Sequence, residues 1–157
     1  MKNHYFSHFP FAELRSQDGR ACFKICSFKY AYPHAKDAVD ADWHRNYLNL
    51  SLPGFKSEVD EIILNGIILD YFIKELQAFE ALHRDKVNLD PIEPYFWLGF
   101  SYICKKSKTI KVKGYVQYPA GIGSVLNFDF QTDLPSIIKF RKGLEGILSK
   151  FPAVYED

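Results

Sequence analysis

The sequence predicts an α+β fold, an antiparallel sheet of five to six strands with two helices packed on one face. Stretches of alternating apolar and polar residues predict the strands, because successive strand side chains point to opposite faces. Two longer stretches carry apolar residues three and four apart, which is the spacing of one helix face. The order of strands, helix, strands and helix is typical of an α+β domain.

Composition allows these elements to form one domain, residues 1–157, with a core that needs no disulfide or metal. A chain of 157 residues buries about 70% of its unfolded surface, and hydrophobic residues make up 47% of this one. Because the chain contains 20 basic and 19 acidic residues, it has no overall electrostatic field that attracts nucleic acid or an anionic membrane. We expect neither as a partner.

The amino terminus and the cysteines predict a cytoplasmic protein. Residues 1–11 lack the apolar run of a signal peptide, and no stretch approaches the roughly 18 apolar residues of a transmembrane helix. The odd set Cys22, Cys26 and Cys104 indicates small core residues in a reducing compartment.

A strand followed by a loop is expected early in the chain. Gly19 marks a turn, and the aromatic-rich segment Ala21–Tyr32 predicts a strand with Cys22 and Cys26 on one face. Small and acidic residues around Pro33 then predict a loop that reaches Ala41.

Alternation next predicts a hairpin. Its first strand ends at the turn Pro53-Gly54, and Phe55–Leu64 forms the second strand. The apolar positions are Leu48, Leu50 and Leu52 in the first strand and Phe55, Val59 and Ile63 in the second.

The stretch Asn65–Arg84 predicts the first long helix, which follows the hairpin directly. Asn65 is a good N-cap residue, because its side chain can accept from an N–H of the first turn. The expected core face consists of Ile68, Phe72, Leu76, Phe79 and Leu82, and it is widened by Ile67, Leu69, Tyr71 and Ile73.

A three-stranded meander is expected after a loop over Asn88–Pro94. Tyr95–Cys104 predicts its first strand, and Lys105–Lys108 an exposed turn. Ile110, Val112 and Val116 alternate in a second strand in which Gly114 indicates a bulge. After a turn at Pro119–Gly123, the residues Leu126, Phe128 and Phe130 alternate in the third strand.

The carboxyl end predicts the second helix. Thr132 or Asp133 can cap it, Pro135 suits its first turn, and Phe151-Pro152 ends it. Its expected apolar face contains Ile137, Ile138, Phe140, Leu144, Ile147 and Leu148.

Two groups of titratable residues invite a search for chemistry. His44 lies near Asp42 in the sequence, and a histidine near a carboxylate can act as a general base or a metal ligand. Asp85, Asp90 and Glu93 surround one loop, and clustered carboxylates can bind a cation. No nucleophile or second ligand stands at a characteristic interval from either group, so packing and solvated loop charges are the favoured interpretations. Likewise, the pair Gly121 and Gly123 precedes a strand rather than a helix, which favours a turn over a phosphate loop. We therefore expect no catalytic residue, no cofactor and no metal.

Two charged segments are candidate binding surfaces. The lysine run from Lys105 to Lys113, with Tyr102 and Tyr115 nearby, has the composition of a nucleic-acid surface, although lysines on a hairpin more often prevent edge-to-edge aggregation. Acidic residues around Asp40 and Asp60 form the opposite patch, which suits a basic partner.

Several short features occur in a fixed order along the chain. They are Asp42-Trp43, Gly54-Phe55, the helix with Phe72 and Leu76, Pro91 with Glu93-Pro94, Leu126-Phe128-Phe130 followed by Thr132-Asp133-Leu134, Ile147-Leu148 and Phe151-Pro152. Together these features resemble the WapI-type immunity proteins of bacterial contact-dependent toxin systems. The resemblance covers roughly Asp40 to Pro152 and leaves the region before Asp37 outside.

The resemblance implies a small cytoplasmic, non-enzymatic protein that binds a cognate toxin domain and occludes its active site. It supplies no catalytic residue, because the matching positions look structural. Since acidic and aromatic residues of immunity proteins often meet basic toxins, the expected contact residues are Asp37, Asp40, Asp42, Trp43, Glu58, Asp60 and Glu61.

Two alternatives remain open at this point. The protein could be a small-ligand-binding or regulatory interaction module that holds an apolar molecule on the aromatic face of the sheet. It could also be an enzyme that uses Asp42 with His44, or the carboxylates Asp85, Asp90 and Glu93. A pocket with convergent polar groups would favour the first alternative, and two such side chains within hydrogen-bond reach in a cleft would favour the second.

Overall fold

The computed structural model describes residues 4–157, so Met1, Lys2 and Asn3 of the predicted domain lie outside the described residues. In chain order the elements are α1 (Tyr5–His8), β1 (Phe11–Arg15), β2 (Cys22–Tyr30), α2 (Ala38–Ala41), β3 (Trp43–Leu52), β4 (Phe55–Asn65), α3 (Gly66–Glu80), β5 (Lys86–Leu89), β6 (Phe96–Cys104), β7 (Thr109–Tyr118), β8 (Ser124–Asp133) and α4 (Leu134–Lys150).

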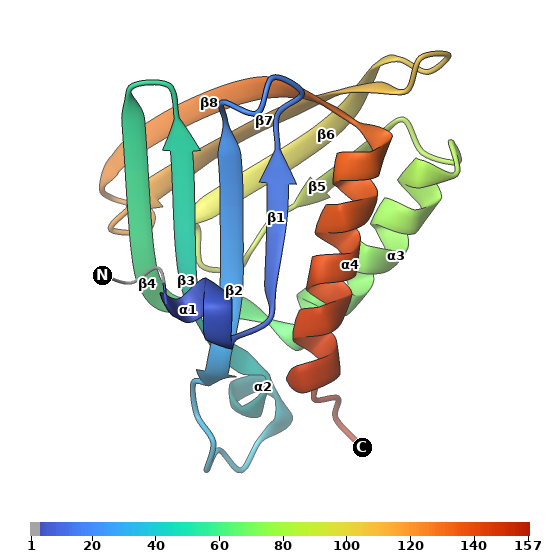
Figure 1. Ribbon diagram of the computed structural model, residues 1–157. Coiled ribbons are helices and arrows are strands. Elements are labelled where there is room, and N and C mark those ends of the chain that lie inside the picture. Colours follow the sequence, from blue (N-terminus) through green and yellow to red (C-terminus); the bar gives the residue numbers. More distant parts are fainter. Residues whose placement is uncertain (1–3) are drawn as a thin grey trace.

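The strands form two antiparallel sheets of four strands, which we call sheet A (β1-β2-β3-β4) and sheet B (β5-β6-β7-β8) (Figure 1). The α+β class is confirmed, but the prediction of a single sheet with five to six strands is wrong. The reason lies in α3, which follows β4 directly and is 15 residues long. A helix of that length spans about 22 Å, so it carries the chain away from β4 before the next strand begins.

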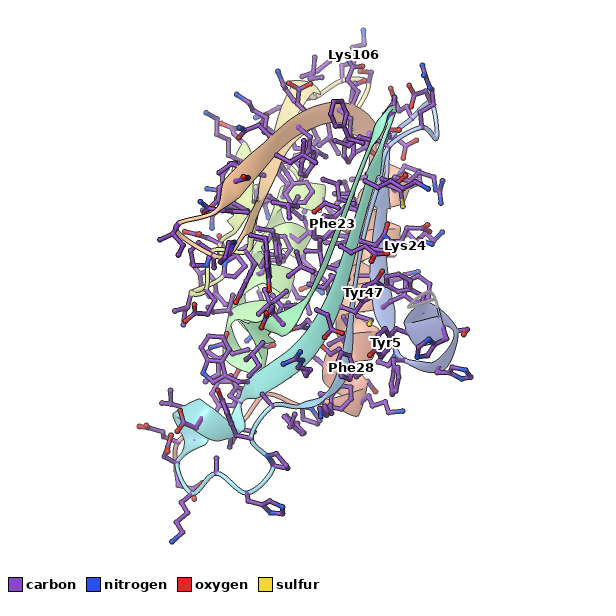
Figure 2. The ribbon with its side chains drawn as sticks, turned by 90° about the vertical axis from the view of Figure 1, so that its left-hand side faces the viewer. Tyr5, Phe23, Lys24, Phe28, Tyr47 and Lys106 are labelled. Carbon is purple, nitrogen blue, oxygen red and sulfur yellow. The ribbon has the colours of Figure 1, made fainter. Side chains whose placement is uncertain are left out.

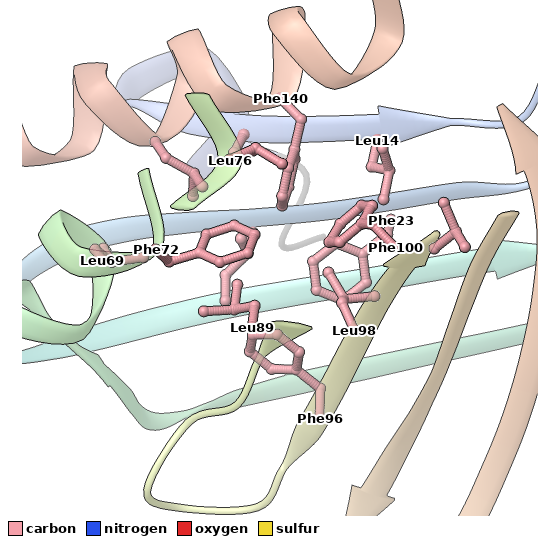
Figure 3. Packing of buried hydrophobic residues seen from close by; sticks show 14 of the residues in the cluster. Leu14, Phe23, Leu69, Phe72, Leu76, Leu89, Phe96, Leu98, Phe100 and Phe140 are labelled. Atoms are coloured by element: carbon pink, nitrogen blue, oxygen red, sulfur yellow. The ribbon is translucent and has the colours of Figure 1, made fainter. Parts of the chain in front are cut away.

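The two long helices complete the core at one side of the two sheets. Helix α4 packs against β1 and α3, while α3 packs against β5. Aromatic rings join the layers, since Phe23 of β2 lies 5.1 Å from Phe96 of β6 and Phe100 of β6 lies 6.2 Å from Phe140 of α4, centroid to centroid. Figure 3 shows these rings among the leucines of the same core.

Helix α3 begins where the sequence predicts and ends earlier. The side chain of Asn65 accepts from the N–H of Ile68, so the predicted cap is confirmed. The helix ends at Glu80 rather than Arg84, because Leu82 adopts a left-handed φ of 63° and the N–H of His83 bonds to the carbonyl of Ala78. Leu82 is therefore 41% exposed and not part of the apolar face.

The buried face of α3 is narrower than the expected one. Phe72, Leu76 and Phe79 are buried as expected, and so are Leu69 and Ile73 of the wider face. Ile68 is only partly buried, and Ile67 and Tyr71 are exposed, so their assignment to the apolar face is wrong.

Helix α4 shields the edge of sheet A. Asp133 caps it by accepting from the N–H of Ser136, and Pro135 lies in its first turn as expected. A Cβ at Gly143 would lie 2.6 Å from Cα of Ala12, so this glycine lets the helix approach β1 closely. Because α4 covers that edge, three consecutive residues, Ala12, Glu13 and Leu14, are buried.

This lack of alternation explains why β1 is missing from the sequence prediction. The other unpredicted strand is β5, which overlaps the expected loop at Asn88 and is only four residues long. The expected loop before Ala41 contains one further element, the single turn α2.

Pairing elsewhere confirms most of the remaining elements. The hairpin β3–β4 and the meander β6–β7–β8 form as predicted. The bulge predicted at Gly114 is wrong, because pairing is continuous there and the register shifts between Tyr102 and Cys104 instead. Gly114 is needed for close approach, since a Cβ would lie 2.6 Å from the carbonyl oxygen of Trp97.

The cysteines are free thiols in two environments. Cys22 and Cys26 are buried, and burial raises the pKa of each thiol to about 11. Cys104 is exposed at the end of β6, so the prediction that it is a core residue is wrong.

Candidate partner-binding surface

His44 is a buried packing residue. It is completely buried, and its Nδ1 lies 2.8 Å from the hydroxyl of Ser27. Its ring packs near Tyr30 and Phe151, and burial lowers its pKa to about 4. An imidazole that stays neutral and enclosed in this way suits packing rather than acid-base chemistry.

Asp42 joins three distant segments of the chain and is only 1% exposed. One carboxylate oxygen accepts from the N–H of Ile67 at 2.8 Å, and the other accepts from the N–H of Val154 at 2.7 Å. Its main-chain carbonyl accepts from the N–H of Gly66. The carboxylate thus stabilises the start of α3 and the carboxyl tail, and it is not available to a partner.

The loop carboxylates do not form a site. Asp85 pairs with Lys105, while Asp90 and Glu93 follow the opposite end of β5. Among residues 4–157, no group of three or more His, Cys, Asp or Glu side chains is placed to hold a metal ion. Over the same residues, no helix is long and apolar enough to cross a membrane.

The acidic residues predicted to contact a partner lie in three different places. The register of β3 with β4 sets Glu58 and Asp60 opposite Asn49 and Tyr47, on the face of sheet A that points away from sheet B. Tyr47 lies on that outer face in Figure 2, near Tyr5 of α1 and Lys24. Asp60 there pairs with Arg45, with 3.2 Å between nitrogen and oxygen.

Glu61 points the other way, because it follows Asp60 in the strand. Its carboxylate accepts from the hydroxyl of Tyr118 at 3.1 Å. Asp37 and Asp40 lie at α2, where Asp37 accepts from the N–H of Asp40, and Trp43 is half-buried at the start of β3. The seven residues therefore form no single patch.

The lysine run lies on the outside of sheet B. β7 pairs with β6 on one side and β8 on the other, so it is not an edge and the edge-protection interpretation of these lysines is wrong. Lys111 and Lys113 alternate with buried Ile110 and Val112, which places both lysines on the outer face. Lys106 lies at the far tip of the β6–β7 hairpin (Figure 2).

The surface of residues 4–157 contains several hollows. One, of about 660 Å³, lies between β8 and the tips of the β1–β2 and β3–β4 hairpins, and its apolar lining includes Leu52, Phe55 and Phe130. Another, of about 490 Å³, lies on the outer face of sheet A beside Phe6, with Lys24, Lys56 and Glu58 in its lining.

Among residues 4–157, the large apolar side chain with the highest exposed fraction lies on the turn between β7 and β8. Ile122 is 87% exposed, and Ile92, which is 62% exposed, lies on the loop between β5 and β6. The two loops lie close together, because a Cβ on Gly121 would be 3.8 Å from Pro94. We call the six residues Glu61, Ile92, Glu93, Tyr95, Tyr118 and Ile122 the Ile122 surface.

Two tyrosines connect the parts of the Ile122 surface. The rings of Tyr95 and Tyr118 lie 6.1 Å apart, and the hydroxyl of Tyr118 reaches Glu61. Partial burial, and then the charges of Glu61 and Glu93, raise the pKa of Tyr95, so both carboxylates act on the same ring. Of the seven predicted contact residues, only Glu61 belongs to this surface.

Sequence analysis identified this turn but not its role. The available signal was an isoleucine between two glycines in Gly121-Ile122-Gly123, an apolar residue at a position that a turn exposes. Tyr95, Ile92 and Glu61 are far from it in sequence, so only the folded chain brings them together.

Comparison with known proteins gives one informative match. The profile of the immunity protein WapI-like family matches residues 13–152. The match begins well before Asp37, so the expectation that this amino-terminal region falls outside the resemblance is wrong for residues 13–36. No curated protein sequence matches the chain.

A chain from the crystal structures of Trypanosoma brucei MRP1/MRP2 has a similar overall shape. Its TM-score is 0.49 at 10% sequence identity, and the alignment covers 95% of this chain and 90% of that chain. A likeness this distant supports no conclusion about function.

Proposed function

The chain belongs to the WapI-like immunity protein family, and from that premise we propose that it binds a cognate toxin domain and blocks its activity without catalysis. The family match over residues 13–152 is the observation that carries the proposal, because immunity is the role that the family name describes. We further propose that it acts in the cytoplasm against the toxin of a contact-dependent system.

Inhibition by binding requires an accessible surface rather than a catalytic cleft. Asp42 and His44, the sequence-based candidates for acid-base chemistry, are buried and stabilise the fold. The predicted contact residues Asp37, Asp40, Asp42, Trp43, Glu58, Asp60 and Glu61 remain proposals. Asp42, which is 1% exposed, is the least accessible of them.

Co-expression tests the proposal directly. The proposal expects a toxin domain to be encoded immediately upstream of this chain. That domain is expressed with and without the chain, and cell survival and complex formation are measured. We expect rescue together with a complex of one inhibitor per toxin. A titration of the purified proteins distinguishes inhibition from enzymatic detoxification, because a stoichiometric inhibitor protects only up to its own concentration. Absence of a complex, or protection by catalytic amounts, would contradict the proposal.

The hollow beside β8 favours a second candidate function, the binding of a small apolar ligand. Its volume of about 660 Å³ and its apolar lining, rimmed by Asp18, Arg20 and Gln131, suit a drug-sized molecule. A thermal-shift screen with small apolar compounds tests this function. Stabilisation by a compound that Leu52→Asp prevents, in the absence of toxin binding, would favour it.

A further inference from the structure

Exposed apolar side chains gather on the Ile122 surface. Ile122, Ile92 and the 52% exposed Tyr118 present apolar carbon to water on neighbouring loops. Single exposed apolar residues are common on soluble proteins, whereas a group of them within a charged rim marks an interaction site. The core gains nothing from an isoleucine at this position.

The turn that carries Ile122 is held in one conformation by its own hydrogen bonds. The side chain of Gln117 donates to the carbonyl of Gly123 at 2.9 Å and accepts from the N–H of Gly121 at 3.1 Å. The N–H of Gly123 also donates to the carbonyl of Pro119 at 2.8 Å, and the N–H of Gln117 donates to Tyr95. A side chain presented by a rigid turn loses little conformational entropy on binding, which favours its use as an anchor.

The rim of the surface is acidic. Within residues 4–157, neither Glu61 nor Glu93 forms an ion pair, so both carboxylates can accept from the cations of a partner. The nearby Asp60 already pairs with Arg45. An apolar centre with carboxylates at its edge that form no ion pair is complementary to an apolar pocket flanked by lysine or arginine.

We propose that the Ile122 surface is the docking surface for the toxin domain: Ile122 enters an apolar pocket of the toxin, and Glu61 and Glu93 pair with basic side chains at the rim of that pocket. This inference rests on the proposed function and adds the contact residues and the chemistry of the partner. The lysine face of sheet B, with Lys111 and Lys113, is the competing surface and would suit an acidic toxin.

Binding measurements with the upstream-encoded toxin domain test the proposal. Ile122→Asp should raise Kd at least about thirty-fold, as expected for a central anchor residue. Glu61→Lys with Glu93→Lys should slow association and reduce its dependence on salt.

Matched controls lie away from this surface. Ile103→Asp charges another exposed isoleucine, which is 51% exposed and lies at the other end of sheet B. Asp129→Lys with Glu156→Lys repeats the same change of net charge elsewhere. Both controls should bind like the wild type. Circular dichroism and thermal melting verify each fold, and Ile122→Ala replaces Ile122→Asp if the latter unfolds.

The outcomes separate the two proposals. If the wild-type protein neither binds the toxin nor protects cells, the proposed function fails. If the wild type binds and the folded Ile122 variants bind equally well, this inference is wrong while the function stands. Weaker binding by Lys111→Glu with Lys113→Glu, but not by the Ile122 variants, would assign docking to the lysine face instead.

Discussion

Substitution of Asp42 by asparagine tests whether this residue serves the fold or the partner. The carboxylate accepts two hydrogen bonds, from Ile67 and Val154, at a site that is 1% exposed. Asparagine keeps one accepting oxygen and replaces the other by an NH₂ group, which faces a donor. One charge-assisted hydrogen bond is therefore lost, and its loss costs about 2 kcal/mol.

The expected effect is large enough to measure by thermal unfolding. For a domain of this size, about 2 kcal/mol corresponds to a fall in Tm of roughly 4–8 °C. Alanine removes both acceptors, so Asp42→Ala should cost about twice as much. Deletion of residues 153–157 removes the Val154 donor and should make the asparagine substitution less costly, because the two changes act on the same contact.

Toxin binding tests the alternative hypothesis, that Asp42 contacts the partner. At temperatures where Asp42→Asn is folded, we expect its toxin affinity to equal that of the wild type. An unchanged Tm combined with weaker toxin binding would refute the structural assignment of Asp42 and return it to the interface.

Three further predictions concern stability. His44 has a pKa of about 4 in the folded chain and 6.5 when free, so the unfolded chain binds a proton first as the pH falls. The free energy of unfolding should therefore decrease by up to about 3 kcal/mol between pH 6.5 and pH 4. Urea titrations of His44→Asn should show a weaker decrease. Burial raises the pKa of Glu13, but hydrogen bonds from Lys139 and Arg15 outweigh it and lower that pKa to about 2. The free energy of unfolding should therefore decrease a second time between pH 4.5 and pH 2. Acid-unfolding curves of Glu13→Gln should lack this second decrease. Gly143→Ala should lower Tm, because its Cβ would meet β1. Gly146→Ala has open space around its Cβ and should raise Tm, because alanine adds the roughly 1 kcal/mol of helix propensity that glycine lacks to the free energy of unfolding.

Local signals in the sequence were sufficient to predict the long elements. Asn65 and Asp133 cap α3 and α4 through side chains that bond within the next three residues, so their role can be recognised from a short stretch. The alternation of Leu48 and Leu50 likewise depends only on the period of a strand. The end of α3 was missed because Leu82, an apolar residue that continues the helical spacing, takes a left-handed conformation that rarely suits leucine.

Long-range pairing could not be predicted in the same way. The sequences of β4 and β6 do not indicate that the two strands belong to different sheets, because apolar and polar residues alternate in both. Asp42 shows the same difficulty, because its partner Val154 lies 112 residues away. The sequence therefore indicated an acidic surface residue at Asp42, where the folded chain uses a buried hydrogen-bond acceptor.

The acidic contact residues illustrate why proximity in sequence is a poor guide to an interface on a sheet. Asp60 and Glu61 are consecutive, yet the pleat of β4 sends Asp60 to the outer face, where Arg45 neutralises it, and sends Glu61 toward sheet B. Only on that side does a carboxylate meet Tyr118 and the rigid turn that exposes Ile122. Reversal of Asp60 and of Glu61 in separate variants should consequently differ, with toxin binding sensitive to Glu61→Lys and sheet stability sensitive to Asp60→Lys.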